Sequence, residues 1–433
     1  MQYIRLEKNL RRSARNKMLS ATHFKQVLWL VVAVTLALQW IALHISRLHL
    51  EPQWEVVSSG LGIFGAAFLL SWAAELAQKD IPQALAIALL ALIAVLPEYA
   101  VDMYFAWTAG KDPKYTAFAM ANMTGANRLL IGVGWAAVVV TYWLKSGKRA
   151  VKLEPGHEIE ILYLGVATIY SFIIPIKGRL DLIDAAVLIA IFVFYMRAAS
   201  KAEHVETELE GPAEMIESWG ERSRRLATVV LFLLSGFTIF IAAEPFAEGL
   251  LATGRTFGIE EFILVQWLAP LASESPEFIV AILFALKAQP GTAMGALLSS
   301  KVNQWTLLIG MLPVVYSISA GNIAGMQIDN RQMEELFLTA AQSLFAVVVL
   351  ANLSFSLMEA TVIFLLFSTQ LLFPDPQFRF YYSIFYVLLA VALVLVNKDT
   401  RQGLRGLFRR APAACAVQNS LAKTVKLKKN QGL

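Results

Sequence analysis

The sequence predicts an all-α membrane protein with about twelve transmembrane helices. Of its 433 residues, 57% are hydrophobic and only 16% are charged, whereas soluble domains carry about 25% charged residues. The apolar residues also come in blocks of about 20, the length of helix that crosses roughly 30 Å of hydrocarbon. The core of a soluble protein would show shorter, amphipathic runs.

Twelve apolar segments are long enough to be helical spans. They cover residues 26–47, 58–78, 82–108, 116–144, 159–175, 180–197, 226–251, 260–287, 291–317, 335–353, 356–373 and 378–396. The third and fourth are longer than a single crossing requires, and both carry polar residues near the middle. Long helices interrupted in this way predict a tilt, a break or a binding site inside the membrane.

The basic residues indicate membrane orientation rather than binding of nucleic acid. If the N-terminus is cytoplasmic, 27 of the 37 Lys and Arg residues lie in cytoplasmic segments and 8 in the opposite loops. This asymmetry is typical of a multi-pass protein with an even number of spans and both termini inside. We therefore expect an integral protein of the plasma (inner) membrane, whose main partner besides its substrate is the lipid bilayer.

The longest internal polar stretch, 198–225, begins acidic and ends basic, and it is too short to fold alone. We interpret it as a cytoplasmic linker between two halves. The predicted organisation is a basic N-terminus with an extra helix, a first repeat, the linker, a second repeat, and an extra helix with a basic tail, at residues 1–57, 58–197, 198–225, 226–373 and 374–433.

The two halves resemble each other in sequence. Leu-Pro-Glu-Tyr at 96–99 corresponds to Ser-Pro-Glu-Phe at 275–278, and Leu-Leu-Ile-Gly occurs at both 129–132 and 307–310. One offset aligns about 35 residues with a single one-residue gap. The matching spans are the third and the eighth, and an odd offset reverses the orientation of the second unit. The pattern thus predicts two inverted five-helix repeats, the architecture of many secondary transporters.

Each Pro-Glu pair places a carboxylate near the middle of the membrane. Such a charge costs several kcal/mol unless it is paired or hydrated, so Glu98 and Glu277 are candidate functional residues. Pro97 and Pro276 cannot donate a backbone hydrogen bond to the carbonyl four residues earlier. Freed carbonyls beside a carboxylate form a hard oxygen site of the kind that Na⁺ or Ca²⁺ needs.

Other oxygen-bearing side chains fall near these two glutamates in the helical repeat. The predicted cation-binding set adds Asp102, Asn122, Ser273, Glu274, Ser300 and Gln304. Lys301 and Arg128 lie inside spans and are predicted to compensate the charge of the carboxylates. The competing interpretation is a buried polar network that only holds helices together.

Around these residues the sequence resembles the cation/Ca²⁺ exchanger superfamily, typified by Na⁺/Ca²⁺ and Ca²⁺/H⁺ exchangers. The family carries a Gly-Thr-Ser-x-Pro-Glu-like segment and, about 23 residues later, a Gly-Ser-Asn-like segment. Residues 271–277 and 299–301 are similar to these in the second half, and 94–98 and 121–123 in the first half. Together the similar stretches span roughly 70 residues.

The resemblance implies ten core helices around a central site, with Glu98 and Glu277 as the principal cation (metal) ligands. The sequence also departs from the family pattern. Hydroxyls are missing at Ala94 and Val95, Glu274 replaces a hydroxyl, and Lys301 replaces an Asn. Ion selectivity and stoichiometry therefore do not follow from the resemblance.

The predicted function is a secondary cation antiporter working by alternating access, with Ca²⁺ or Na⁺ exchanged against H⁺ or Na⁺. The alternatives are a cation channel or a non-transporting membrane protein on the same fold. We expect no enzymatic activity, because no convincing catalytic constellation is present, and no cofactor beyond the transported cations. The sequence contains no phosphate-binding Gly-rich loop, which argues against coupling to ATP.

The charge distribution makes the topology testable. Reporter domains fused after Lys148 and after Arg222 should both report a cytoplasmic location, because these sites flank segments rich in Lys and Arg. A signal from the opposite side at either position would contradict the inverted-repeat layout.

Overall fold

The computed structural model describes residues 2–407 apart from 49, 78, 81–94, 201–208, 210, 324 and 374, with side chains from residue 23 onward except that of Pro155. Helices in the first half are α1 (Gln2–Ile45), α2 (Pro52–Ala77), α4 (Leu96–Ala109), α5 (Tyr115–Leu129), η1 (Leu130–Trp135), α6 (Ala136–Ser146), η2 (Pro155–His157), α7 (Glu158–Ser171), α8 (Ile173–Lys177) and α9 (Leu182–Ala199).

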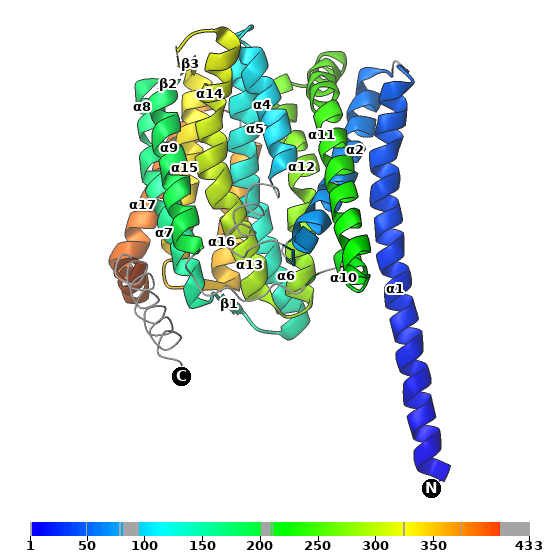
Figure 1. The fold of residues 1–433 in the computed structure, drawn as a ribbon. Helices are drawn as coiled ribbons and strands as arrows, with labels where there is room; N and C mark the ends of the chain where they lie inside the picture. The colour runs from blue at the N-terminus through cyan, green and yellow to red at the C-terminus, as the bar shows by residue number, and fades with distance from the viewer. Residues whose placement is uncertain are drawn as a thin grey trace, which may run out of the picture.

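The second half follows a short helix in the linker, α10 (Pro212–Glu217). Its helices are α11 (Glu221–Phe257), α12 (Glu261–Leu286), α13 (Pro290–Asn303), η3 (Gln304–Leu308), α14 (Ile309–Ala320), α15 (Asn330–Leu350), α16 (Leu357–Leu372) and α17 (Pro376–Val396). The helices run side by side as one bundle, beyond whose lower end the start of α1 projects (Figure 1).

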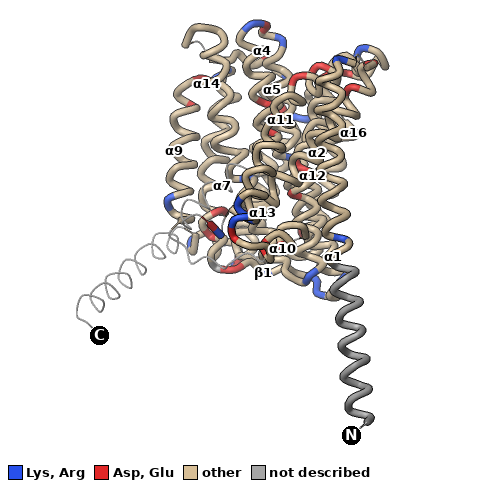
Figure 2. The backbone as a smooth tube through the Cα atoms, turned by 45° about the vertical axis from the view of Figure 1, so that its right-hand side comes forward, with Lys and Arg blue, Asp and Glu red and all other residues tan. Residues whose placement is uncertain are grey.

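The chain is an integral, multi-pass membrane protein. Among the described residues, nine helices are long and apolar enough to cross a membrane, and Leu357–Leu372 is a shorter apolar helix. Helices occupy all twelve predicted segments, although residues 82–94 of the third lie outside the described part of the chain. Lys, Arg, Asp and Glu lie mostly at the two ends of the bundle (Figure 2).

Two of the long spans are interrupted by π-helical turns, η1 between α5 and α6 and η3 between α13 and α14. A tilt, a break or a binding site was predicted for the first of these spans, and neither a tilt nor a break was predicted for the second. A π-turn shifts the register of the following helix and is frequent at functional sites. Here η3 begins at Gln304, one of the predicted ligands.

Short strands close both ends of the bundle. β1 (Ala150–Lys152) pairs antiparallel with β4 (Ser354–Ser356), and β2 (Arg179–Leu180) pairs antiparallel with β3 (Met326–Gln327). β1 lies at the lower end of Figure 1, and β2 and β3 lie at the upper end. Each pair joins one strand from either half of the chain, so the strands tie the two halves together at both ends.

Local sequence sets where the helices after these strands begin. Asp181, Asp329 and Ser356 accept hydrogen bonds from backbone N–H groups in the first turns of α9, α15 and α16. Each start is a capping box, in which the third helical residue also bonds back to the cap. These caps fix the direction in which α9, α15 and α16 re-enter the bundle.

A close helix crossing brings α5 against α12. A Cβ atom added to Gly125 would lie 1.8 Å from the carbonyl oxygen of Gln266, so the two backbones are in direct contact there. Only glycine permits this approach. The crossing holds the helix that carries Asn122 against the helix that carries Glu274 and Glu277.

Replacing Gly125 by Ala should therefore push α5 from α12 and lower the stability of the folded protein, by at least about 2 kcal/mol for overpacking against backbone. The measurement is the thermal unfolding midpoint and folded yield in detergent. Gly236→Ala is the matched control, because its added methyl would meet no atom within 4 Å. Equal stability of the two variants would contradict the close crossing.

Candidate cation-binding site

The first predicted glutamate lies at the start of α4. Glu98 is in the first turn and 1% exposed, and neither of its carboxylate oxygens has a hydrogen-bond partner among the described residues. Asp102 lies one turn later and is fully buried. Its Oδ1 accepts a hydrogen bond of 2.9 Å from Nδ2 of Asn122 on α5. The backbone that Pro97 was predicted to disturb includes residues outside the described range.

The second predicted glutamate lies in the middle of α12, which has Pro270 and Pro276 in its interior. Glu274 is buried, whereas Glu277 is partly exposed and its Oε2 is buried without a partner. The Ser273 hydroxyl donates a hydrogen bond of 3.2 Å to the carbonyl of Ala269, which leaves the lone pairs of its oxygen available to a ligand.

An amide on η3 connects α12 with α13. Nε2 of Gln304 donates to Oε1 of Glu274 at 3.0 Å and reaches Oγ of Ser300 at 3.3 Å. No described residue donates a hydrogen bond to the Oε1 atom of Gln304. The NH₂ group of this amide is thus turned towards protein oxygens, and its carbonyl oxygen remains available to a ligand.

The leftover polar atoms of the predicted set are all acceptors. Within the part of the chain that the structure describes, they are Oε1 and Oε2 of Glu98, Oδ2 of Asp102, Oδ1 of Asn122, Oε2 of Glu274, Oε2 of Glu277 and Oε1 of Gln304. A buried acceptor without a donor costs about 1–3 kcal/mol, and more when it is charged. A cation supplies what all seven oxygens lack.

The carboxylates of the two halves share one region of the bundle. Glu98 experiences the charges of Glu274, Asp102 and Glu277, and of the ammonium of Lys301. In the part of the chain that the structure describes, no three His, Cys, Asp or Glu side chains are arranged as a metal centre. A cation bound here would therefore be coordinated by neutral amide and hydroxyl oxygens as well as by carboxylates.

Lys301 is a fully buried ammonium on α13. Its Nζ donates to Oδ1 of Asn127 at 2.6 Å and to the backbone oxygen of Asn127 at 3.2 Å, and it lies 4.4 Å from the centre of the Trp305 ring. Its charge also acts on Glu274 and Glu98. The structure thus places Lys301 beside the predicted site.

Arg128 has a different partner from the carboxylates it was predicted to compensate. Its Nη2 lies 2.5 Å from Oε2 of Glu335 on α15, and its guanidinium lies 5.0 Å from the centre of the Trp267 ring. Adjacent helical residues point about 100° apart, so Asn127 faces Lys301 while Arg128 faces α15. This ion pair packs α5 against α15.

Sequence reasoning missed three residues in this region. Asn127 accepts from Lys301, Asn303 accepts 2.9 Å from the Tyr99 hydroxyl, and Glu335 holds Arg128. The signal for the first two was a buried amide in an apolar span, which is rare unless it is hydrogen-bonded. Nothing in the sequence indicated that Glu335 pairs with Arg128.

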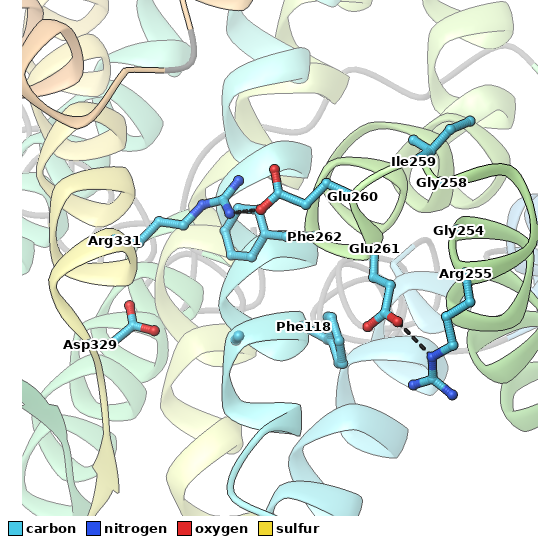
Figure 3. Close-up of a pocket in the computed structure, with 11 residues that line it drawn as sticks. Phe118, Gly254, Arg255, Gly258, Ile259, Glu260, Glu261, Phe262, Asp329 and Arg331 are labelled. Atoms are coloured by element: carbon cyan, nitrogen blue, oxygen red, sulfur yellow. Dashed lines mark hydrogen bonds and ion pairs between the residues drawn. The ribbon is translucent and has the colours of Figure 1, made fainter.

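A separate pocket of about 570 Å³ lies where α11 and α12 meet, on the side of Phe118 (Figure 3). Phe118 is one turn before Asn122 on α5. Two of the pocket's three carboxylates are engaged by arginines, Glu261 by Arg255 at 2.6 Å and Glu260 by Arg331, and the third, Asp329, caps α15. These neutralised carboxylates contrast with the unpartnered oxygens of the predicted site.

Comparison with known proteins identifies the family. The sequence profile described as sodium/calcium exchanger protein matches residues 53–201 and 227–396. Comparison with curated proteins gave no match. Among solved structures, one titled H+/Ca2+ exchanger CAX is 45% identical, with a TM-score of 0.87 over 91% of this chain and 99% of that chain.

More distant structures share the fold. A Ca2+/H+ antiporter, YfkE, is 13% identical with a TM-score of 0.59 over 85% of this chain and 99% of that chain. A structure of the sodium-calcium exchanger NCX_Mj is 14% identical with a TM-score of 0.50 over 75% of this chain and 99% of that chain. The chain belongs to the sodium/calcium exchanger family and is a cation antiporter.

Proposed function

We propose that the chain exchanges Ca²⁺ for H⁺ at the site formed by Glu98 and Glu277. The observation that carries the proposal is the set of seven buried acceptor oxygens without donors, contributed by α4, α5, α12 and η3. The similarity to a protein named as an H⁺/Ca²⁺ exchanger supports the choice of ions.

The chemistry of the ligands suits calcium. Ca²⁺ takes 6–8 oxygen ligands in flexible geometry, from carboxylates, amides, hydroxyls and water. Glu98, Glu277 and Glu274 supply negative charge. Asn122 and Gln304 supply neutral amide oxygens, which are free of donors among the described residues because each amide bonds a carboxylate through its NH₂ group. Water can complete the shell where Glu277 is partly exposed.

Protons can replace the cation, because neighbouring carboxylates would repel each other once the cation has left. A protonated carboxyl carries an O–H that donates a hydrogen bond to a neighbouring carboxylate. Glu98 and Glu274 are near enough for their charges to interact. Binding of Ca²⁺ and binding of protons at such oxygens are mutually exclusive, which is the requirement for exchange.

The strand pairs support an inverted repeat. The offset of about 178 residues that relates the halves brings β1 near β3 and β2 near β4 in sequence. Related strands occupy opposite ends of the bundle, since β1–β4 closes one end and β2–β3 the other (Figure 1). Inverted units around one site provide two equivalent ways to open it, towards either side of the membrane.

The proposed layout keeps the repeats at 58–197 and 226–373, with an extra helix at each end and both termini cytoplasmic in the plasma membrane. Two features support it. The family profile matches the chain in two separate segments, 53–201 and 227–396. In addition, α1 starts and α17 ends towards the lower end of the bundle in Figure 1, the end where β1 lies.

Glu98→Gln and Glu277→Gln should each abolish Ca²⁺ transport while folding is kept. Each removes one ligand charge from a site secluded from bulk water, which should cost at least a few kcal/mol of binding, or more than about 100-fold in affinity. The measurement is isotope flux into proteoliposomes together with folded yield. Glu261→Gln, at the separate pocket, is the matched control and should transport normally. Wild-type flux in either site variant would remove that residue from the site.

Lys301→Asn should leave the protein folded and change ion preference or pH dependence, with tighter divalent binding as the expected direction. The substitution removes a positive charge that acts on Glu274 and Glu98, and it retains a side chain able to hydrogen-bond Asn127. The measurement is competition of Ca²⁺ and Na⁺ for flux over a range of pH. Unchanged competition would show that the ammonium has no influence on the site.

A pH gradient alone should drive Ca²⁺ uptake against its own gradient in proteoliposomes free of Na⁺. This follows because protons are proposed to replace Ca²⁺ at the carboxylates. Adding a Na⁺ gradient should change the rate little. Full activity with a Na⁺ gradient and none with a pH gradient would overturn the choice of the coupling ion while leaving the antiport itself intact.

A further inference from the structure

A histidine outside the cation site packs against the helix that carries part of that site. His157 ends the short helix η2, which joins β1 to α7. A Cβ atom added to Gly295 of α13 would lie 2.2 Å from Cε1 of the imidazole, so the ring rests on the α13 backbone. Gly295 is five residues before Ser300, about 7.5 Å along the helix.

The surroundings of the ring favour its charged form. Nδ1 of His157 lies 3.8 Å from Oε2 of Glu160, and neither atom has a hydrogen-bond partner in the described ranges. The ring also hydrogen-bonds the backbone of Gly291, and the carboxylate of Glu154 is close. Burial acts to lower the pKa of His157, but Glu160, Glu154 and the Gly291 backbone outweigh burial, and the pKa is raised.

The groups facing the ring can be assigned element by element. Glu154 precedes η2, and Glu160 lies in the first turn of α7. The start of α13, residues 290–295, has no titratable side chain. From α9, Tyr195 senses the charge of Glu160, and its hydroxyl lies 2.9 Å from that of Ser299 on α13. The carboxylates that act on the ring are Glu160 and Glu154, and the buried Glu158 is a third acid, in the first turn of α7.

We propose that His157 is a second, regulatory proton-binding site, which in its charged form holds the start of α13 and slows exchange at low cytoplasmic pH. Charged His157 attracts Glu160 and Glu154 and stays seated on Gly295. Because α13 leads to Ser300, Lys301 and Gln304, holding its start restrains the residues that must move as the site opens and closes.

The direction of the effect follows from the raised pKa. The stabilising contact is fully present below the ordinary histidine pKa and is lost as pH rises through the raised value. Exchange should therefore accelerate with rising cytoplasmic pH. An antiporter that brings protons into the cell while it exports Ca²⁺ would then slow itself as the cytoplasm acidifies. The inference rests on the proposed Ca²⁺/H⁺ exchange and on the proposed topology.

The test is Ca²⁺ self-exchange in proteoliposomes at equal Ca²⁺ and equal pH on both sides, measured over a series of pH values. Self-exchange needs no net proton movement, so it separates regulation from driving force. The wild-type rate should rise with pH. At saturating Ca²⁺, where protons compete least for the site carboxylates, His157→Gln should exchange faster than wild type at low pH, because a neutral side chain cannot make the ionic contact. His23→Gln, on exposed α1, is the matched control and should follow the wild-type curve.

Two further variants fix the cause. Glu160→Gln should move the midpoint of the rate curve to lower pH by up to about one unit, because an opposite charge that raised the pKa is gone. Gly295→Ala should displace the ring and resemble His157→Gln. Folded yield and the thermal midpoint at each pH accompany all variants.

The outcomes distinguish the two proposals. If His157→Gln reproduces the wild-type rate curve, His157 is not a regulatory site, and the proposed exchange is unaffected. If His157→Gln does not fold, the same conclusion follows from a wild-type curve in Glu160→Gln. If wild-type protein shows no Ca²⁺ self-exchange at any pH but transports another cation, the proposed function has failed. The same rate series with that cation then tests His157 separately.

Discussion

The organisation of this protein depends on one constraint, that an acceptor oxygen inside a membrane must have a donor or a cation. Most buried polar groups in the bundle meet it through local bonds, such as Thr124 to the carbonyl of Met120 and Ser171 to that of Ala167. The oxygens around Glu98 and Glu274 do not. Their lack of donors is destabilising for the fold alone, and it is the basis of the cation site proposed above.

Two of the buried cations in the described part of the bundle, Arg128 and Lys301, illustrate two ways of meeting that constraint. Arg128 is neutralised at 2.5 Å by Glu335 and covered by Trp267, which gives a fixed contact between α5 and α15. Lys301 instead donates to an amide, Asn127, and lies over an aromatic face. Its charge is therefore less fully compensated locally and remains available to the carboxylates on α4 and α12.

Much of the fold was predictable because membrane insertion imposes strong rules on sequence. Every predicted span contains helix, apart from residues 82–94, which are not described. The Pro-Glu pairs indicated the central carboxylates because a mid-membrane charge is costly and the two pairs repeat at one offset. Side-chain partners were less predictable. Arg128 faces α15, which follows from helix packing between segments about 200 residues apart, and no local pattern encodes it.

The same reasoning explains why the π-turn at Gln304 was missed. Hydropathy is unchanged by a one-residue register shift, so residues 291–317 read as one continuous helix. Yet the shift decides which side chains face the site. Gln304 starts η3 and bonds Glu274, and Ser300 lies one turn before it on α13. The helix that carries these predicted ligands is therefore regular at its start, where His157 rests on Gly295, and irregular from Gln304 onward. A restraint at the regular end can be transmitted through rigid helix as far as Gln304, where the altered backbone bonding offers a place for local adjustment.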